Sequence, residues 1–296
     1  MSLSEIYRVG VACTVGIGPA HGGRSRNEDN YLVGREGEVR VRLGDQEHVE
    51  DALSDPTLVL AVADGMGGHE DGEVASTTTV QAISRLYGRP RPRDVEATMR
   101  EFVLDTHHRL RPTVSVGGVV KMGTTLTLLW VIAGRGYWVH VGDSRLYLLR
   151  AGELLTLTRD HTRAEFARRD GRPEPPYPNH LSQNFLYGSR GLGNDESLRI
   201  DHGVDTGSLN LLQGDRLLLC SDGLHGFVDI EMIRDALSAG DDATGAAKGL
   251  VAAAMRAEGD DNITAVVLEV TGDPTTQPEP DPEDDWAAGD GTLVPL

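Results

Sequence analysis

Several aspartates of this sequence stand at the ends of short apolar runs. Three follow such a run within two residues, and two precede one. A single Asp-Gly after a strand is most often only a turn, so one instance would predict nothing. If the runs are neighbouring strands, however, their ends gather several carboxylates, and mutual repulsion forbids this unless a cation neutralises them. The aspartates in these positions are Asp64, Asp143, Asp222, Asp261 and Asp29.

A site built from carboxylates alone selects hard cations. Oxygen ligands without thiolates favour Mg²⁺ or Mn²⁺ over zinc. The sequence contains only two cysteines, Cys13 and Cys220, and each lies among apolar neighbours. This setting is typical of buried free thiols and argues against a disulfide framework or a cysteine-based zinc site. The chemistry expected at the strand ends is therefore that of a magnesium or manganese site.

The elements that must bring these aspartates together come in groups. Short β-like runs dominate both ends of the sequence, and helical stretches occur in pairs between them. Grouped strands and paired helices favour an α+β domain with hairpin-connected antiparallel sheets over regular alternation and a parallel sheet. The expected strands are 11–17, 58–63, 124–132, 137–141, 146–149, 216–220 and 263–270, and the expected helices are 72–87, 93–110, 229–237 and 242–256.

Composition narrows the range of partners. The 296 residues can bury a large core, and 46 Asp and Glu against 28 Lys and Arg give a net charge of -18. Such an acidic chain is a poor partner for nucleic acid or an anionic membrane. The longest apolar stretch, 126–133, is too short to span a bilayer, and the N-terminus lacks a basic region followed by an apolar core. We therefore expect a cytoplasmic protein, and we take it to be a monomer.

Two segments lack the periodic apolar pattern of strands and helices. Residues 168–185 contain four prolines and little periodicity, which predicts an irregular surface segment of a kind that is often functional. Residues 273–296 hold seven acids, five prolines and no Lys or Arg. That composition cannot bury enough apolar surface to fold alone. We expect one domain over 1–272 and an acidic, proline-rich disordered tail over 273–296.

Seven short motifs occur in order along the chain. Together they resemble the metal-dependent serine/threonine protein phosphatase family (PPM, or type 2C) in its bacterial form. One motif alone would be a weak signal, but seven in the family's order over roughly 240 residues are specific. The motifs are Arg24-Ser25-Arg26-Asn27-Glu28-Asp29, Asp64-Gly65-Met66-Gly67-Gly68-His69, Gly123-Thr124-Thr125, Gly142-Asp143-Ser144-Arg145, Thr158-Arg159-Asp160-His161, Ser221-Asp222-Gly223-Leu224 and Asp261-Asn262-Ile263-Thr264.

The resemblance implies a fold and a binuclear metal centre. The fold is a four-layer α+β sandwich of two antiparallel β-sheets flanked by helices, with a flap-like segment at about 162–190. Asp64 would bridge two cations at one edge of the sandwich. The Gly65 carbonyl and Asp29 would serve one cation, and Asp222 and Asp261 the other. A weaker third ion would be held by Asp143 together with Asp222.

The resemblance also implies an activity. A hydroxide bridging two Mn²⁺ or Mg²⁺ ions would hydrolyse phosphoserine and phosphothreonine in proteins, because such ions lower the pKa of water from about 15.7 towards neutrality. Arg24 matches the family's phosphate-gripping arginine, whose planar fork can hold two phosphate oxygens. Glu28 is expected to orient water bound to the metals. The implied partners are phosphorylated proteins, substrates of a Ser/Thr kinase in signalling.

Two positions depart from the pattern of eukaryotic relatives. Met66 stands where those relatives place a histidine proposed as general acid, so the leaving-group proton would come from water or from another residue. His69 is close in sequence, and an acid role and a structural role both remain open for it. Gly226 replaces a residue that is often acidic and serves the third cation, which weakens the prediction of that third site.

Two other functions are alternatives to this one. A catalytically silent, phosphatase-like scaffold that binds phosphoproteins would be expected to lack metal ligands, and all of them are present. A partner-switching phosphatase that acts on a phosphorylated regulator of transcription is not excluded by the sequence. We interpret His161 as a structural residue that pins the segment after Asp160. The other histidines are expected to be solvated.

Overall fold

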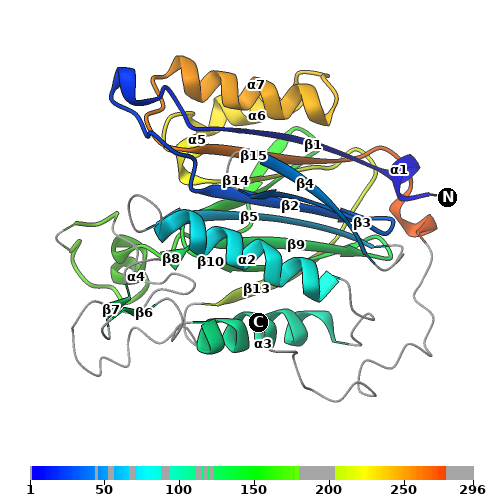
Figure 1. The fold of residues 1–296 in the computed structure, drawn as a ribbon. Helices are drawn as coiled ribbons and strands as arrows, with labels where there is room; N and C mark the ends of the chain where they lie inside the picture. The colour runs from blue at the N-terminus through cyan, green and yellow to red at the C-terminus, as the bar shows by residue number, and fades with distance from the viewer. Residues whose placement is uncertain are drawn as a thin grey trace.

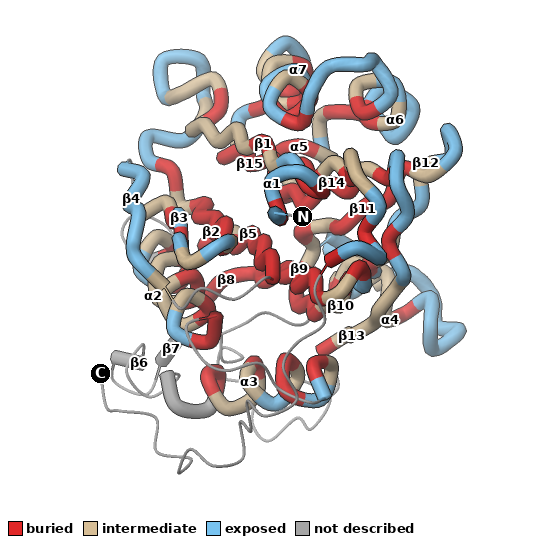
Figure 2. The backbone as a smooth tube through the Cα atoms, turned by 90° about the vertical axis from the view of Figure 1, so that its right-hand side faces the viewer, coloured by how far each residue is buried: buried red, intermediate tan, exposed pale blue. Residues whose placement is uncertain are grey.

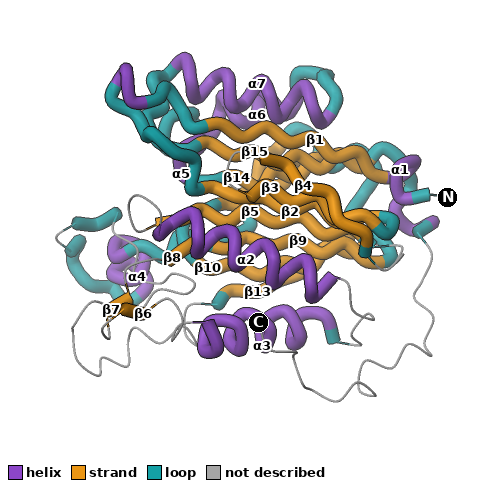
Figure 3. The backbone as a smooth tube through the Cα atoms, in the orientation of Figure 1, coloured by secondary structure: helices purple, strands orange, loops and turns teal. Residues whose placement is uncertain are grey.

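Two antiparallel β-sheets stacked face to face, with helices on both outer faces, make up the computed structural model of the chain (Figure 1). Figure 3 shows the resulting order of layers, with helices above and below the strands. The predicted four-layer α+β sandwich is confirmed. The structure describes residues 2–43, 46–52, 57–66, 71–87, 94–110, 115–116, 119–120, 123–175, 177–179 and 204–277.

The first sheet joins the two ends of the chain. Its strand order is β1-β15-β14-β11-β12, and every neighbouring pair is antiparallel. The β14 strand is almost fully buried, as expected for a strand between two layers. The strands are β1 (Tyr7–Thr14), β11 (Arg145–Arg150), β12 (Glu153–Thr156), β14 (Arg216–Cys220) and β15 (Ile263–Val270).

The second sheet is larger and has the order β13-β10-β9-β5-β2-β3-β4. Its central β9 strand is buried along its whole length, in keeping with its sequence of Leu, Val, Ile, Thr and Trp. The strands are β2 (Asp29–Arg35), β3 (Glu38–Leu43), β4 (Gln46–Asp51), β5 (Leu58–Met66), β9 (Leu126–Ile132), β10 (Arg135–Val141) and β13 (Asp205–Asn210). Short strands are β8 (Gly123–Thr124), which pairs with the end of β5, and the separate pair β6 (Ser115–Val116) and β7 (Val119–Val120).

Helices cover both outer faces. Helices α2 (Asp71–Tyr87) and α3 (Val95–Leu110) pack on the second sheet, while α6 (Ile230–Ser238) and α7 (Ala243–Arg256) pack on the first. Asp229 and Asp242 cap α6 and α7 by accepting from backbone amides three residues on. Gly10 in β1 lets α7 approach closely, because a Cβ there would lie 2.1 Å from the Ala243 carbonyl oxygen. The shorter helices are α1 (Leu3–Ile6), α4 (Arg163–Arg169), α5 (Asp222–His225), η1 (Pro19–His21) and η4 (Pro274–Thr276).

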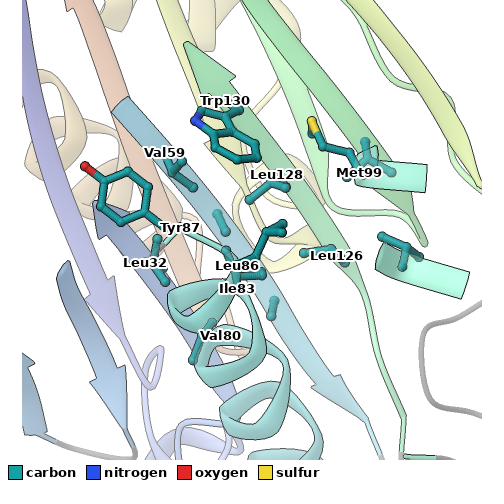
Figure 4. Packing of buried hydrophobic residues seen from close by; sticks show 14 of the residues in the cluster. Leu32, Val59, Val80, Ile83, Leu86, Tyr87, Met99, Leu126, Leu128 and Trp130 are labelled. Atoms are coloured by element: carbon teal, nitrogen blue, oxygen red, sulfur yellow. The ribbon is translucent and has the colours of Figure 1, made fainter. Parts of the chain in front are cut away.

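Three apolar clusters hold the layers together. One lies between the sheets, and one lies under each helical layer. Figure 2 shows the buried strands running through the middle of the molecule. Figure 4 shows the cluster under α2 and α3, where Ile83, Tyr87 and Met99 meet Leu128 and Trp130 of β9. Burial of one such side chain stabilises the fold by about 1.5–3 kcal/mol, so these clusters fix the strand positions firmly.

The expected elements agree with the structure, with a few exceptions. All eleven predicted strands and helices occur, most with shifts of a few residues at their ends. Seven strands were not among the expected ones. Six are very short or have polar or mixed sequences with little apolar signal, namely β3, β4, β6, β7, β12 and β13. The seventh, β2, is buried, but only its short apolar run 31–33 was recognised. The expected flap-like segment begins with the helix α4, and its part from 180 to 190 lies outside the described residues.

The boundary expected at residue 272 falls inside the folded body. Residues 274–276 form η4, and Gln277 is buried. Its Oε1 accepts from the Tyr7 hydroxyl at 3.0 Å and from the Gly134 amide at 3.1 Å. The first five residues of the predicted disordered tail are therefore ordered, because one polar side chain finds two buried donors. The rest of that tail, 278–296, lies outside the described residues.

The cysteines and two of the histidines are buried or partly buried. Cys13 and Cys220 are free thiols, as expected. His107 and His140 are buried, so the expectation that they are solvated is wrong. Among the described helices, none is long and apolar enough to cross a membrane.

Candidate active site

The second sheet supplies two carboxylates that face each other. In the antiparallel pairing of β2 with β5, Asp29 lies directly opposite Asp64. Asp64 was expected just after its strand but lies within it, because β5 continues to Met66 and pairs there with β8. Gly65 is required at this point, since a Cβ would lie 2.2 Å from the Gly72 carbonyl oxygen at the start of α2.

The first sheet supplies two more carboxylates at the same edge. Asp222 begins α5 one residue after the end of β14, and Asp261 directly precedes the Asn262 that leads into β15. The two strands are in register, and the Ser221 amide donates to the Thr264 carbonyl at 3.2 Å. This edge lies on the left in Figure 1, between the labels α5 and β8.

Electrostatics show that the aspartates of the two sheets lie close together. Burial raises the pKa of Asp64 well above its usual range, and the charges of four neighbouring aspartates raise it further. Burial likewise raises the pKa of Asp29 to about 7 and that of Asp143 to about 8. Such mutual repulsion is relieved when a cation lies among the carboxylates. The four neighbours of Asp64 are Asp29, Asp222, Asp143 and Asp261.

Two hydroxyl groups from the first sheet hold the Asp29 side chain. Ser221 Oγ and Thr264 Oγ1 each donate to Asp29 Oδ2 at 2.7 Å, and the Thr264 amide donates back to Ser221 Oγ at 3.0 Å. The other carboxylate oxygen, Asp29 Oδ1, is buried and has no hydrogen-bond partner among the residues that the structure describes. Sequence reasoning missed these hydroxyls, although both residues stand inside the recognised motifs. Asp29 is therefore fixed across the two sheets with one oxygen uncommitted.

The Thr125 hydroxyl group links Asp64 to the turn that carries Asp143. The Asp64 amide donates to Thr125 Oγ1 at 3.0 Å, and the Thr125 amide donates to the Asp64 carbonyl at 2.8 Å. Thr125 Oγ1 also lies 2.7 Å from Ser144 Oγ. The Thr124 hydroxyl adds a bond to the Asp64 carbonyl at 2.9 Å. The Thr125 hydroxyl of the Gly-Thr-Thr motif thus links the backbone of Asp64 to Ser144, the residue after Asp143.

Arg24 pairs with one of the carboxylates. Its Nε and Nη2 donate to Asp261 Oδ1 and Oδ2, both at 2.8 Å. The Arg24 side chain is 56% exposed and that of Asp261 is 32% exposed, so this is a surface pair whose planar fork is accessible. The Glu28 side chain lies against the start of α2, because a Cβ on Gly72 would come within 2.3 Å of Glu28 Oε2.

The donor set fits hard divalent cations. The candidate ligands are carboxylate and carbonyl oxygens, which suit Mg²⁺ and Mn²⁺. The buried, unpartnered Asp29 Oδ1 is an oxygen that a cation could bind. Within the described residues, no three acidic, histidine or cysteine side chains already form a closed metal-binding group. The pairing of Asp261 with Arg24 accounts for part of this, because it turns one carboxylate towards a guanidinium.

An open groove of about 930 Å³ begins at this edge. Asp143, Asp222 and Asp261 line one end, and the N-terminal part of α4 lines the other. Arg145, which also lines the groove, is held by Asp160 through two hydrogen bonds of 2.9 and 2.7 Å. A groove of this volume beside gathered carboxylates has room for a phosphorylated segment of a protein.

Comparison with known proteins identifies the family. The protein phosphatase 2C family profile matches residues 42–258. The serine/threonine protein phosphatase PstP of Mycobacterium tuberculosis is 36% identical over 225 residues, which are 75% of this chain and 42% of the relative. The protein phosphatase PhpP of Streptococcus pneumoniae is 30% identical over 219 residues, which are 72% of this chain and 85% of the relative.

A solved structure supports the same assignment. The catalytic domain of PstP in complex with two manganese ions superposes with a TM-score of 0.68 and 31% identity, over 90% of this chain and 99% of that one. This chain spans 42% of the length of the full mycobacterial relative, so it corresponds to only part of that protein. Since the profile matches most of the chain and the fold agrees, the chain belongs to the protein phosphatase 2C family.

Proposed function

We propose that this chain is a metal-dependent phosphatase that removes phosphate from phosphoserine and phosphothreonine in proteins. One observation carries the proposal: aspartates from both sheets gather at one edge, where each raises the pKa of Asp64. The structure of the PstP catalytic domain with two manganese ions supports it, because that domain shares the fold at 31% identity. The names of the relatives support the protein substrate.

The candidate ligands divide between two Mn²⁺ or Mg²⁺ ions. Asp64 lies at the centre of the carboxylates and would contact both ions. Asp29, through its unpartnered Oδ1, would serve one ion with the Gly65 carbonyl. Asp222 and Asp261 would serve the other. In this assignment each carboxylate binds an ion at the position where its strand ends. The ions would offset both the burial and the mutual repulsion that raise the pKa values of Asp64 and Asp222.

The remaining groups act on the phosphate and on water. When bound, two such cations lower the pKa of a shared water towards neutrality, which makes hydroxide available at physiological pH. Arg24 would turn its planar fork from Asp261 to two oxygens of the phosphoryl group and stabilise the charge that develops there. Glu28 would accept a hydrogen bond from water at the site. Met66 cannot donate a proton, so the leaving group would take its proton from water or from another residue.

A weaker third ion is part of the proposal. Asp143 lines the groove beside Asp222, and the charge of Asp222 raises the pKa of Asp143 after burial has done so. A cation between these two carboxylates would relieve that repulsion. Gly226 offers no carboxylate there, so we expect this ion to bind less tightly than the other two.

The biological setting is also a proposal. We expect the substrates to be proteins phosphorylated by a Ser/Thr kinase, in a signalling role, with the chain acting as a cytoplasmic monomer. The groove between the carboxylates and α4 would receive the phosphorylated segment.

The proposal is tested by hydrolysis of p-nitrophenyl phosphate and of a phosphothreonine peptide by the purified full chain. We expect turnover with Mn²⁺ or Mg²⁺ and none with a chelator, and restoration when Mn²⁺ is added in excess. Full activity in chelator would contradict the metal site. Binding of the phosphopeptide without hydrolysis under any metal condition would instead support a phosphoprotein-binding scaffold.

A further inference from the structure

Two buried histidines hold the turn that carries Asp143. The turn joins β10 to β11 and passes through Gly142, whose φ of 115° is a conformation that side chains rarely adopt. The backbone amide of His161 donates to the Gly142 carbonyl at 2.7 Å, and His161 Nδ1 accepts from the Gly142 amide at 3.1 Å. His140 Nε2 lies 3.0 Å from the same carbonyl. Both polar groups of Gly142 are therefore bonded to histidines.

His161 also connects this turn to two other elements. Because its Nδ1 accepts a hydrogen bond, its proton lies on Nε2, which is 3.3 Å from Asp205 Oδ2 on β13. The next residue, Thr162, is the N-cap of α4 and accepts from the Glu165 amide at 3.3 Å. His161 thus stands where the groove-lining helix α4 meets the Asp143 turn.

His140 also holds the turn that carries Asp143. Its Nε2 faces the carbonyl oxygens of Gly142 and Arg159, both at 3.0 Å, and must therefore carry the proton. Its Nδ1 then accepts from the Thr127 hydroxyl at 2.9 Å. Burial lowers the pKa of His140 to about 3, so the ring is neutral and this tautomer is the one present. The rings of His140 and His161 lie 4.8 Å apart.

The Asp143 side chain depends on this support. Within the described part of the chain, its carboxylate receives no hydrogen bond from another side chain, and its carbonyl accepts from His225 Nε2 at 2.9 Å. The carboxylate is therefore placed by its backbone, and the backbone beside it is a glycine that has no side chain of its own to pack. Removing the Nδ1 acceptor of His161 would leave the Gly142 amide buried without a partner, and the turn would shift to satisfy it.

We propose that His161 is a positioning residue for Asp143: it holds Gly142 and thereby sets the Asp143 carboxylate towards a cation in the groove. The proposal rests on the proposed function, since it concerns the weaker third ion. Residues that orient a metal ligand without touching the metal typically affect affinity by about 10–100-fold when mutated. Asp205 would support His161 in turn through the charge contact of 3.3 Å between its Oδ2 and His161 Nε2, which lacks the alignment of a hydrogen bond.

The test is a double-mutant cycle read by Mn²⁺ binding to the full chain without substrate. The variants are H161A, H161N, D143N and the double variant H161A/D143N, and free Mn²⁺ is followed by its electron paramagnetic resonance signal. We expect H161A to weaken the most weakly bound ion about tenfold and to change the tighter ions less than about twofold. H161N should restore binding, because its Oδ1 can accept from the Gly142 amide in place of Nδ1.

The double variant decides between positioning and a general effect. If His161 acts through Asp143, H161A adds less than about a twofold change once Asp143 is replaced. An equal effect of H161A in both backgrounds, or no effect on any bound ion, overturns the proposal. Thermal unfolding identifies a variant that fails to fold, in which case D205N, whose side chain is partly exposed, takes the place of H161A and should weaken the same ion. A wild-type chain that binds no Mn²⁺ overturns the proposed function itself.

Discussion

Asp29 and Asp143 lie at the same edge of the sandwich, but one is held through its side chain and the other through its backbone. The carboxylate of Asp29 is gripped directly, by hydroxyl groups of Ser221 and Thr264 that come from the opposite sheet. Asp143 is held through its carbonyl and through the neighbouring glycine, while its carboxylate lies in the groove. One carboxylate is thus fixed by its side chain and the other by its backbone.

The difference predicts two kinds of cation site. In a buried carboxylate of the Asp29 kind, one oxygen accepts the hydrogen bonds and the other is left for a cation. Such a carboxylate offers a single, preorganised contact, so binding requires little reorganisation. The Asp143 carboxylate lines the groove and, within the described residues, receives no hydrogen bond from another side chain. It is placed by a turn, so its site is more easily disturbed. We therefore expect Asp29 to serve a tightly bound ion and Asp143 a weakly bound one.

The largest expected effects come from the carboxylates themselves. Asp29→Asn, Asp64→Asn or Asp222→Asn should lower kcat by roughly a thousandfold, since several kcal/mol of transition-state stabilisation depends on the metals. Asp143→Asn should lower kcat only about tenfold at saturating Mn²⁺, because a weaker ion is lost. The measurement is turnover of p-nitrophenyl phosphate against Mn²⁺ concentration with folded variants. Equal losses of kcat for Asp29→Asn and Asp143→Asn would contradict the expected difference between a tight and a weak ion site.

A third candidate ligand, Asp261, is held by an ion pair with Arg24. An exposed salt bridge is worth about 0–1 kcal/mol, whereas a charge-assisted bond to a bound phosphate is worth about 1.5–3 kcal/mol. Arg24→Ala should therefore lower kcat/KM on a phosphopeptide roughly ten- to a hundredfold without weakening Mn²⁺ binding. Arg24→Lys should recover part of the loss, since an ammonium cannot grip two oxygens. Wild-type kcat/KM in Arg24→Ala would leave only the salt bridge to Asp261.

Removing one hydroxyl group tests the grip on Asp29. Ser221→Ala should weaken Mn²⁺ binding about tenfold at a tight site, because Asp29 keeps only the Thr264 donor. Ser238→Ala is a matched control, since that hydroxyl bonds to the Arg234 carbonyl on the exposed end of α6. Calorimetric titration with Mn²⁺ compares the two variants. If Ser221→Ala binds Mn²⁺ as tightly as the control, direct hydrogen bonding does not prepare Asp29 for the ion.

The smallest effect is expected far from both carboxylates. A chain ending at Gly272 loses Gln277 and leaves the Tyr7 hydroxyl and the Gly134 amide without this partner. A lost buried hydrogen bond costs about 1–3 kcal/mol, so the melting temperature should fall by roughly 2–10 °C. A chain ending at Gln277 should melt like the full chain. Both should turn over p-nitrophenyl phosphate normally, and a loss of turnover in the longer one would assign a catalytic role to the tail.

Much of the fold and the candidate ligands could be read from the sequence. The apolar runs that lead to Asp64, Asp143 and Asp222 are strong local signals, because strands buried between layers are rich in apolar residues. Their repetition indicated a cation site before any contact was known. Exposed strands such as β4 escaped prediction, since an edge strand that faces water carries no such pattern. The composition of the tail also did not predict that Gln277 is ordered, because composition describes the average behaviour of a segment and not one buried side chain.

Only the tertiary structure decided how the ligands are held. No pattern in the chain indicates that Ser221 and Thr264 bond to Asp29, because these residues lie 192 and 235 positions away from it. The same is true of His161 and Gly142, whose hydrogen bond joins a turn to the start of a helix. Residue types and spacing determine which strands form and which carboxylates lie at their ends. Hydrogen bonds between strands depend on the stacking of two sheets, and that stacking is fixed by apolar burial summed over the whole chain rather than by any local segment.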